Sequence, residues 1–356
     1  MSVYQSPDFD NHEHVSFFCD ETTGLRAIVA IHSTAPFGIA GGGCRMWPYG
    51  SDDEALNDAL RLSRAMSYKL ALCDMPAGGA KCVVIGDPAK DKSEALLRAL
   101  GKAVERLNGK YIIAEDVGTT TEDMRVIGKE TKFVVGKQTD TGPATAYGTF
   151  VGLRTAAMKA FGKTDLTGLR VAVQGLGNVG RRLCRHLARA GAKLVVSDVN
   201  ENAVKAVVSD GELGATAVLP DAIFDQDVDI FAPCALGAIL NDSTIPRLRC
   251  KVIAGSANNQ LAEERHGDVL AERGILYAPD FVVNAGGVIG ASQEGTQLGG
   301  GTNGTLVYDE AVAFRDTERI AGILNAVFDR SEREGISSHT AAVRLAKEKI
   351  RSRQGR

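Results

Sequence analysis

Residues 170–180 read Arg-Val-Ala-Val-Gln-Gly-Leu-Gly-Asn-Val-Gly, an apolar run followed by glycines spaced as G-x-G-x-x-G. The run predicts a short buried strand, and the segment 178–190, with apolar residues four apart, predicts a helix that ends at Gly191. A second apolar run over 193–197 predicts another strand, which is followed by Asp198. A strand, a glycine turn, a helix and a second strand that ends in an acid are typical of a Rossmann dinucleotide-binding unit.

Each position of this motif has a physical task in holding a dinucleotide. The first glycine allows a tight turn, the second lets the backbone approach the pyrophosphate, and the third lets helix and strand pack closely, so that helical N–H groups face the phosphates. Asp198 is expected to bind the ribose hydroxyls and to repel the 2′-phosphate of NADP, so the predicted cofactor is NAD. A buried βαβ unit without a ligand is the alternative interpretation. The predicted contacts are Gly175, Gly177, Asn178, Val179, Gly180 and Asp198.

The composition is that of a globular protein long enough for two domains, with 356 residues, 44% hydrophobic and 24% charged. A formal net charge of −3 argues against nucleic acid or an anionic membrane as the main partner. The cysteines form no C-x-x-C pair and the N-terminus shows no signal peptide, so we expect reduced thiols and a cytoplasmic protein. We expect no metal site: His12 and His14 lack clustered ligands and are expected to be solvated. The basic stretch 347–356 is expected to be a solvated helix face with a frayed tail.

The residues before the motif predict a separate α/β domain. The runs 15–19 and 25–32 are rich in β-branched and aromatic residues and flank a turn, which indicates an antiparallel hairpin. Ser51-Asp-Asp-Glu54 predicts a capping box that begins a helix reaching about Leu72. The polar stretch 139–143, which contains glycine and proline, is the expected domain boundary.

Two lysines and an aspartate of this first domain are candidates for catalysis. Lys69 falls near the end of the first long helix, Lys81 where a glycine loop enters an apolar strand, and Asp116 at the end of another strand. Hydride transfer from an amino acid needs a cation for the carboxylate, a group that takes the ammonium proton and a group that handles water attack on the imine; these residues could supply all three. From spacing alone, however, such a lysine is more often a solvated dipole partner, and such an aspartate a helix cap.

Nine motifs run through nearly the whole chain in one order. They are Gly41-Gly-Gly-Cys-Arg-Met-Trp47, Met66-Ser-Tyr-Lys69, Gly78-Gly-Ala-Lys81, Ala114-Glu-Asp-Val-Gly-Thr119, Thr145-Ala-Tyr-Gly148, Gln174-Gly-Leu-Gly-Asn178, Ala232-Pro-Cys-Ala235, Ala257-Asn-Asn-Gln260 and Pro279-Asp-Phe-Val-Val-Asn-Ala-Gly-Gly287. Together they resemble the leucine, phenylalanine and valine dehydrogenases of the glutamate dehydrogenase superfamily. The resemblance implies NAD-dependent oxidative deamination of an L-amino acid to its 2-oxo acid, ammonia and NADH, and the reverse amination.

The resemblance also implies a role for each matching residue. Lys81 would activate the water that attacks the imine and polarise the developing carbonyl, and Asp116 would relay the amino-group proton. Lys69 would bind the substrate carboxylate with help from glycine backbone. The substrate contacts implied in this way are Lys69, Gly42, Gly43 and Asn284, and the contacts to the nicotinamide ribose are Ala235 and Asn258.

The expected architecture is two α/β domains separated by a cleft. Residues 1–140 would form a substrate-binding and oligomerisation domain, and residues 141–329 a Rossmann NAD-binding domain. The resemblance implies that C-terminal helices over about 330–356 pack back on the first domain, and that the chain forms a homo-oligomer through that domain.

Side-chain specificity is the finest expectation that the sequence supports. The loop 74–77 and the passage 289–305 look closer to phenylalanine-specific members than to branched-chain ones. The small residues Ala77, Gly290 and Ala291 would leave room for a ring, which favours L-phenylalanine as substrate and phenylpyruvate as product. Leucine or valine, with the same mechanism, is the alternative. A hydroxy-acid dehydrogenase would usually place a histidine opposite the nicotinamide, and the expected loops contain none. A non-catalytic NAD-binding regulator would have no need for Lys81 and Asp116.

Overall fold

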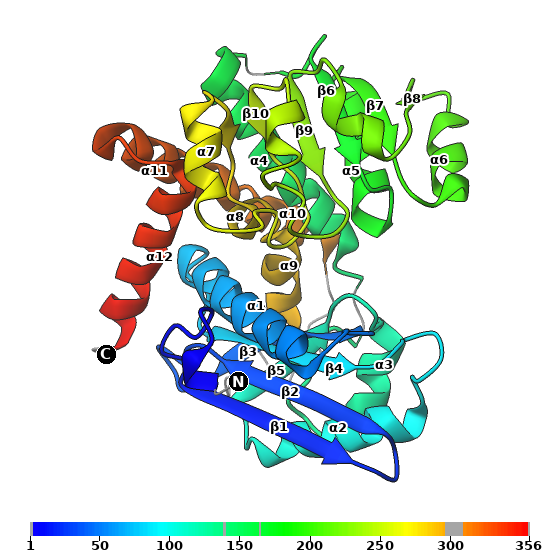
Figure 1. The fold of residues 1–356 in the computed structure, drawn as a ribbon, viewed down its shortest axis with the longest axis vertical. Coiled ribbons are helices and arrows are strands. Elements are labelled where there is room, and N and C mark those ends of the chain that lie inside the picture. The colour runs from blue at the N-terminus through cyan, green and yellow to red at the C-terminus, as the bar shows by residue number, and fades with distance from the viewer. Residues whose placement is uncertain (1–2, 138–139, 164, 296–308, 355–356) are drawn as a thin grey trace. The chain divides into compact units, whose positions relative to one another are not determined.

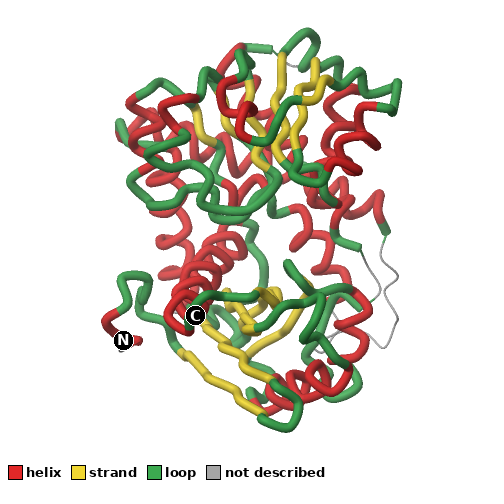
Figure 2. The backbone as a smooth tube through the Cα atoms, turned by 45° about the vertical axis from the view of Figure 1, so that its right-hand side comes forward, coloured by secondary structure: helices red, strands yellow, loops and turns green. Residues whose placement is uncertain are grey.

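The computed structural model describes residues 3–137, 140–163, 165–295 and 309–354, and these divide into two compact units (Figure 1). Each unit contains one sheet with helices packed on it, as the strands and helices in Figure 2 show. The described residues of unit 1 are 3–137, 140, 291–295 and 346–354, and those of unit 2 are 141–163, 165–290 and 309–345. The C-terminal stretch is therefore divided: residues from Ala346 onward group with unit 1, and the helical residues before them group with unit 2.

Unit 1 is built on a five-stranded mixed sheet in the order β1-β2-β4-β3-β5. Its strands are β1 (His14–Asp20), β2 (Leu25–Ile31), β3 (Ala40–Trp47), β4 (Gly78–Ile85) and β5 (Tyr111–Glu115). β1 pairs antiparallel with β2, which confirms the expected hairpin, and β2 pairs antiparallel with β4. β3 lies parallel to both β4 and β5, so these three strands present their carboxyl ends at one edge of the sheet.

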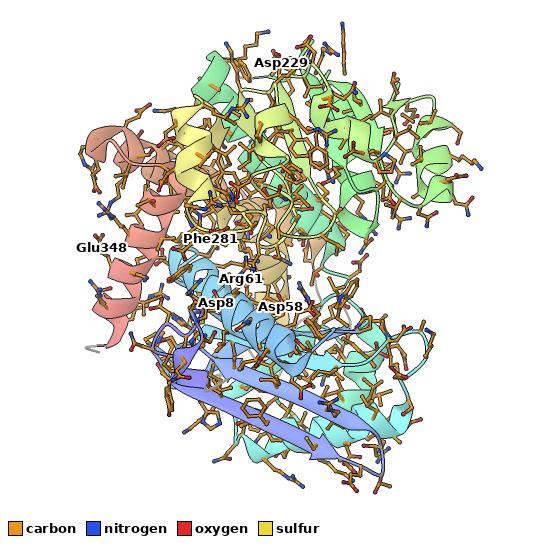
Figure 3. The ribbon with its side chains drawn as sticks, in the orientation of Figure 1. Asp8, Asp58, Arg61, Asp229, Phe281 and Glu348 are labelled. Atoms are coloured by element: carbon orange, nitrogen blue, oxygen red, sulfur yellow. The ribbon has the colours of Figure 1, made fainter. Side chains whose placement is uncertain are left out.

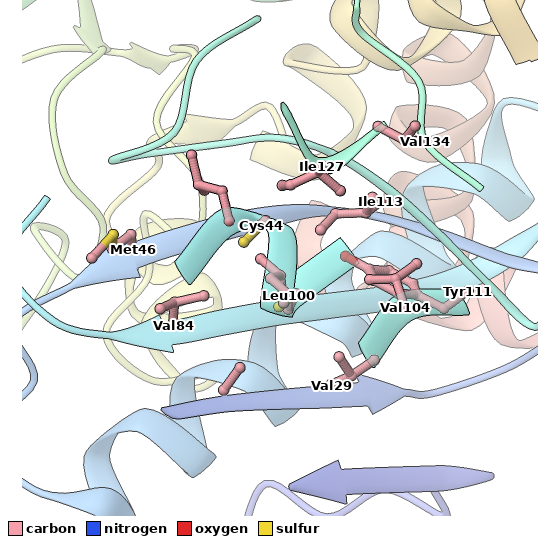
Figure 4. Packing of buried hydrophobic residues seen from close by; sticks show 14 of the residues in the cluster. Val29, Cys44, Met46, Val84, Leu100, Val104, Tyr111, Ile113, Ile127 and Val134 are labelled. Atoms are coloured by element: carbon pink, nitrogen blue, oxygen red, sulfur yellow. The ribbon is translucent and has the colours of Figure 1, made fainter. Parts of the chain in front are cut away.

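Helices cover both faces of this sheet. The helices of unit 1 are α1 (Asp52–Leu72), α2 (Glu94–Arg106) and α3 (Thr121–Ile127). Side chains alternate along a strand, so Val83 of β4 joins the core beneath α1 while Val84 joins the core formed with α2 and α3. Figure 4 shows that second core, where Val84 and Leu100 of α2 lie among the buried side chains.

The predicted start of α1 is confirmed in part. The Ser51 side chain accepts a hydrogen bond from the Glu54 N–H, as a helix N-cap should. The Glu54 carboxylate, however, accepts from the N–H of Gly50, so the reciprocal bond of a capping box goes to the residue before the cap. At the other end, Lys69 lies in the last turn, as expected.

Unit 2 carries a six-stranded parallel sheet in the order β11-β10-β9-β6-β7-β8. Its strands are β6 (Arg170–Gln174), β7 (Lys193–Ser197), β8 (Thr216–Ala217), β9 (Ile230–Pro233), β10 (Val252–Ile253) and β11 (Leu276–Tyr277). Numbered within the unit, this is the 3-2-1-4-5-6 order of a Rossmann fold, which confirms the predicted fold class. The strand order reverses between β6 and β9, the point at which such sheets bind ligands.

The helix that follows the glycine motif matches its prediction. α5 (Asn178–Arg189) has Gly177 as its N-cap, and Gly191, with φ of 81°, follows its C-cap residue Ala190. None of the helices in the described ranges is long and apolar enough to cross a membrane. The remaining helices are α4 (Gly142–Phe161), α6 (Glu201–Val208), α7 (His266–Glu272), α8 (Asp280–Val283), α9 (Gly286–Gly295), α10 (Glu310–Thr317), α11 (Arg319–Glu334) and α12 (Ser338–Gln354).

Two polar segments expected to be solvated make internal contacts instead. His12 is buried, and its Nε2 lies 3.1 Å from the carbonyl oxygen of Leu60 and 3.0 Å from the hydroxyl of Ser63. Burial lowers the pKa of His12 to about 4, so this ring is a neutral core group. The basic stretch in α12 is solvated only in part, because Arg351 is exposed but Arg353 donates to the Asp74 carboxylate beside the end of α1. Long-range contacts, which a linear pattern does not contain, are the reason for both errors.

Candidate active site

A glycine platform on β3 forms the floor of the candidate site in unit 1. A side chain at Gly42 would place its Cβ 1.7 Å from the carbonyl oxygen of Ala80 on β4, and the Tyr111 hydroxyl donates to the Gly42 carbonyl at 2.8 Å. A Cβ at Gly43 would lie 2.8 Å from the Asp116 Cβ and 3.3 Å from the Lys81 Nζ. Only glycine at position 43 leaves room for these two side chains, so the predicted substrate glycines lie directly beside the predicted catalytic pair.

Lys81 and Asp116 form a buried ion pair. The Lys81 Nζ lies 3.0 Å from Asp116 Oδ2, and the two side chains are only 4% and 14% exposed. Lys81 lies within β4 and Asp116 directly follows β5. The Asp116 N–H donates to the Thr119 hydroxyl, which in turn donates to the Cys44 carbonyl on β3, so the loop after β5 is held against its neighbouring strand. The sheet therefore fixes the positions of both side chains.

The position of Lys81 corrects one detail of the sequence prediction. Gly78 and Gly79 do not form a loop before the strand but are its first two residues. A Cβ at Gly78 would lie 1.9 Å from the carbonyl oxygen of Ser33, and one at Gly79 would lie 2.0 Å from the backbone nitrogen of Ser67 on α1. The glycines thus serve close packing within the sheet and under α1.

Lys69 is buried in the last turn of α1, close to where that helix crosses β4. The crossing is marked by the hydrogen bond from the Gly79 N–H to the Ser67 hydroxyl at 3.1 Å. Lys69 and Lys81 each follow this crossing by two residues along their own element. The structure therefore holds both lysines on elements joined at one packed contact.

Arg45 extends the ion pair into a network of charged side chains that the sequence analysis missed. Its Nε lies 3.0 Å from the same Asp116 oxygen that Lys81 contacts, and its other end lies 3.0 Å from the Asp58 carboxylate on α1, labelled in Figure 3. The Tyr49 hydroxyl donates to Asp58 at 2.7 Å. Arg45 falls two residues after Gly43 and so on the same face of β3, a signal that could have predicted its involvement. Asp58 carried no comparable signal.

The charges of this network of side chains determine the protonation states of the groups within it. Burial alone would raise the pKa of Asp116, but the neighbouring Lys81 and Arg45 outweigh burial and hold that pKa well below its ordinary value. Burial and Asp58 together raise the pKa of the Tyr49 phenol, so Tyr49 stays a proton donor. Asp116 is accordingly a carboxylate at neutral pH, the form that can accept a proton.

In unit 2, the loop after β6 has the geometry of a phosphate-binding turn. Gly175 has φ of +94°, and a Cβ there would lie 2.8 Å from the Ala235 side chain, across the point where the strand order reverses. A Cβ at Gly180 would lie 1.9 Å from the Gly175 carbonyl oxygen, whereas one at Gly177 would meet nothing within 4 Å. Gly177 caps α5 without any side-chain hydrogen bond to the first N–H groups. The three glycines therefore occupy the positions predicted for turn, approach and packing.

Asp198 lies at the end of β7 beside this turn. Its Oδ2 accepts from the Leu176 N–H at 2.6 Å, and its Oδ1 accepts from the Asn200 N–H at 2.8 Å. Each carboxylate oxygen can accept more than one hydrogen bond, so both can still receive a ribose hydroxyl. An open glycine cap and a carboxylate bonded to the same loop fit a dinucleotide with an unmodified 2′-hydroxyl.

Two asparagines form a second polar cluster in unit 2. The Asn284 amide donates to the Ser256 carbonyl at 3.1 Å and to the Asn258 side-chain oxygen at 2.8 Å. The side-chain oxygen of Asn284 is buried and has no hydrogen-bond partner among the described residues. A buried acceptor of this kind calls for a donor from outside, such as a substrate N–H group. Asn284 and Asn258, predicted separately, are thus brought together.

Among the residues that the structure describes, a group of potential metal ligands in unit 2 is formed by Asp242, Glu263 and His266. Arg265 already bonds both carboxylates, at 2.6 and 2.9 Å, and the His266 Nδ1 accepts from the Glu263 N–H. These contacts use the ligand atoms internally, and the group has the character of a structural ion-pair cluster.

Profiles of one protein family match nearly the whole chain. The Glu/Leu/Phe/Val dehydrogenase dimerisation domain matches residues 12–133, and the Glutamate/Leucine/Phenylalanine/Valine dehydrogenase profile matches residues 136–206 and 198–355. Leucine dehydrogenase of Bacillus cereus is 49% identical, with 99% of this chain and 94% of that protein aligned. Phenylalanine dehydrogenase of Bacillus thermotolerans is 45% identical, with 96% and 89% aligned. The crystal structure of L-tryptophan dehydrogenase from Nostoc punctiforme is 45% identical and matches with a TM-score of 0.77 over 96% of both chains.

A parallel Rossmann sheet, joined in one chain to a mixed-sheet domain with a buried lysine–aspartate pair, defines a two-domain α/β oxidoreductase. The chain belongs to the Glu/Leu/Phe/Val dehydrogenase family, as its motifs indicated. It is an amino acid dehydrogenase, an oxidoreductase that acts on CH–NH2 groups, and its family uses NAD(P).

Proposed function

We propose that this chain catalyses the reversible, NAD-dependent oxidative deamination of an aliphatic L-amino acid, with L-leucine as the preferred substrate. The observation that best supports the reaction is the buried Lys81–Asp116 pair beside Gly43, in which a carboxylate and an amine lie next to glycine backbone. The products are the 2-oxo acid, ammonia and NADH.

The proposed chemistry divides into three tasks for residues of unit 1. Lys69 binds the substrate carboxylate, with the Gly42 and Gly43 backbone beside it. Asp116, held as a carboxylate by its cationic neighbours, accepts a proton from the substrate ammonium group. Lys81, 3.0 Å from Asp116, acts in its neutral form, after losing its own proton to solvent, and takes the proton of the water that attacks the imine carbon. Asp116 then returns its proton to the nitrogen, the hydroxyl proton of the intermediate passes to solvent as the carbonyl forms, and the C–N bond breaks to release ammonia.

Unit 2 supplies the remaining groups. When bound, NAD accepts the hydride from the substrate Cα. Gly175, Gly177, Asn178, Val179 and Gly180 would hold its pyrophosphate, Asp198 the adenosine ribose, and Ala235 with Asn258 the nicotinamide ribose. The unpaired oxygen of Asn284 supports a hydrogen bond from the substrate. Because a carboxylate at position 198 repels a 2′-phosphate, we propose NAD rather than NADP.

Relatives change the preferred substrate from the phenylalanine expected from the sequence. The leucine dehydrogenase of Bacillus cereus shares 49% of aligned residues with this chain, against 45% for the phenylalanine dehydrogenase named above. Identity of this kind supports an aliphatic substrate more strongly than small residues at three positions support an aromatic one. One methylene in an apolar pocket is worth only about 1–3 kcal/mol of discrimination, so activity on several substrates is expected.

We also propose that the chain assembles as a homo-oligomer through unit 1, whose family profile is described as a dimerisation domain. The experiment that tests the activity follows NADH absorbance with L-leucine, L-valine, L-phenylalanine, L-tryptophan or L-glutamate and either NAD or NADP. We expect the highest kcat/KM with leucine and NAD, and reversal only when ammonia accompanies the 2-oxo acid. A preference for phenylalanine would support the proposed reaction together with the specificity expected from the sequence. If no amino acid led to reduction of NAD or NADP, the proposed function would be overturned.

A further inference from the structure

Arg45 lies at the centre of the network of charged side chains that crosses unit 1. Its guanidinium group joins Asp116, which directly follows β5, to Asp58, in the second turn of α1, with both contacts at 3.0 Å. The Arg45 side chain is 18% exposed, and the carboxylates are 14% and 23% exposed. A planar guanidinium with a rigid fork of donors fixes the direction of each carboxylate that it contacts, which a lysine at the same place would not do.

This network of charged side chains connects the two structural elements whose separation must stay fixed during the proposed reaction. Asp116 is the proposed proton acceptor, and α1 carries Lys69, the proposed anchor for the substrate carboxylate. Asp58 lies earlier on the same helix, so the contact through Arg45 ties that helix to the reacting carboxylate. Because the two substrate groups are joined to one carbon atom, the two protein groups that meet them must hold a fixed separation.

Arg45 and Lys81 meet the same oxygen of Asp116, Oδ2. Two cations on one oxygen orient the carboxylate and favour its ionised form. Cys44 on β3 and Tyr111 on β5 also interact electrostatically with this carboxylate, and Cys82 on β4 adjoins both of them. Tyr49 and Asp58 complete the surroundings on the side of α1. Among these described groups, Arg45 and Lys81 are the two cations in contact with Asp116.

We propose that Arg45, anchored by Asp58, is a positioning residue for the proton acceptor Asp116 and for the helix that carries Lys69. The proposal rests on the function proposed above. It predicts that the two ends of the guanidinium act differently: loss of Arg45 removes charge and orientation together, whereas loss of the Asp58 charge removes the anchor and leaves the positive charge beside Asp116.

The pH dependence follows from these charges. The pKa of Asp116 lies below its ordinary value, so the group is active as an acceptor above that pKa and loses activity as pH falls through it. Removing the Arg45 charge raises the pKa of Asp116, and the loss of activity then begins at a higher pH. Removing the Asp58 charge does not raise it, because the guanidinium charge remains.

The test compares four variants with the wild type in kcat and KM for L-leucine from about pH 4, close to the ordinary pKa of an aspartate, to about pH 9. In Arg45→Gln, kcat/KM should fall about 100-fold at the alkaline end, the loss typical of a misplaced reacting group, and the ratio to wild type should fall further towards acid pH. Arg45→Lys should restore a ratio that does not change with pH, because the charge returns. Asp58→Asn should lower kcat/KM, about 10-fold, by an amount that is the same at every pH.

Arg64→Gln is the matched control, since Arg64 of α1 likewise pairs with an aspartate, Asp8, and at 16% its exposure is close to that of Arg45. Its ratio to wild type should stay near one at all pH values. NADH binding, measured by fluorescence, should be unchanged in every variant and shows that the chain is folded. Equal, pH-independent losses in Arg45→Gln and Asp58→Asn would overturn the proposal and leave Arg45 a merely structural residue. Wild-type turnover is measured first: its absence overturns the proposed function, whereas turnover with a flat ratio overturns only the role of Arg45.

Discussion

The candidate sites of the two units are built by different means. In unit 2, a single stretch of chain from β6 to Asp198 supplies the turn, the helix N-terminus and the carboxylate. In unit 1, charged side chains from three strands or their ends and from a helix form a network of ion pairs. The Arg45–Asp116 contact in this network joins residues 71 positions apart. The candidate site of unit 2 is built from backbone geometry, and that of unit 1 from paired charged side chains.

This difference teaches where function is sensitive to a single substitution. A carboxylate or lysine removed from a buried pair leaves its partner's charge uncompensated, and that cost is larger than the loss of one exposed contact. A backbone site loses one ligand contact at a time. Substitution of Lys81 or Asp116 in unit 1 should therefore abolish chemistry, whereas substitution of Asp198 in unit 2 should weaken cofactor binding and leave chemistry intact at saturation.

The largest expected effect is that of Lys81→Ala. It removes the proposed base and leaves Asp116 with Arg45 alone, so kcat with L-leucine should fall about 10³-fold, within the range expected for loss of general acid–base catalysis. NADH affinity, measured by fluorescence titration, should stay within a few fold because the dinucleotide motif lies in unit 2. A variant that kept most of its turnover would show that the role assigned to Lys81 is wrong.

The chain offers a matched control for this substitution. Lys92 pairs with Asp123 at 2.8 Å, with exposures of 19% and 11%, so it forms a partly buried lysine–carboxylate contact in the same unit. Lys92→Ala should lower stability while leaving kcat nearly unchanged. If both variants lost turnover equally, the effect of Lys81→Ala would reflect damage to the fold of unit 1.

The same contrast explains how far the sequence could predict the molecule. The spacing of Gly175, Gly177 and Gly180 indicated a strand, a turn and a helix, because local backbone demands are written in consecutive residues. Resemblance brought Lys81 and Asp116 together, but spacing gave no reason for Arg45 to reach Asp58, since that contact depends on how α1 lies on the sheet. Gly78 and Gly79 were mistaken for a loop for the same reason: the close approach of Ser33 and Ser67 is tertiary.

The second expected effect is a loss of cofactor affinity in Asp198→Ala. The substitution removes the proposed acceptor of the ribose hydroxyls, and charged hydrogen bonds of this kind contribute about 1.5–3 kcal/mol each, so the Kd for NAD should rise at least about 10-fold. At saturating NAD, kcat should stay within a few fold, and discrimination against NADP should weaken. Isothermal titration with each cofactor measures both effects.

Asp229→Ala is the control for that loss. Asp229, labelled in Figure 3, accepts a hydrogen bond from the Arg170 N–H at 2.8 Å where β6 begins, so it also caps backbone in unit 2 but at the opposite end of that strand. Its removal should leave the Kd for NAD unchanged. Unchanged affinity in Asp198→Ala would refute the ribose contact and leave Asp198 as a support for the Leu176 N–H.

The smallest expected effect concerns the C-terminal end of α1. It tests whether this end of the helix also depends on contacts with residues far along the sequence. The last carbonyl groups of a helix lack partners within the helix. Here Arg353 donates to the carbonyl oxygens of Ala71 and Met75, each at 3.1 Å, and Lys349 donates to that of Leu72 at 3.3 Å. Residues far along the chain therefore close the turn that carries Lys69.

Arg353→Ala should accordingly destabilise unit 1 by about 1–3 kcal/mol, the usual contribution of hydrogen bonds to a charged group, and lower the urea midpoint of its unfolding. Because Lys69 lies in the turn that loses its partners, KM for L-leucine should rise a few fold while kcat changes little. Arg351→Ala, two residues earlier and exposed, should change neither quantity. Equal behaviour of the two variants would mean that the sheet alone holds the end of α1. Unit 1 would then depend less on contacts between residues far apart in sequence than its network of charged side chains indicates.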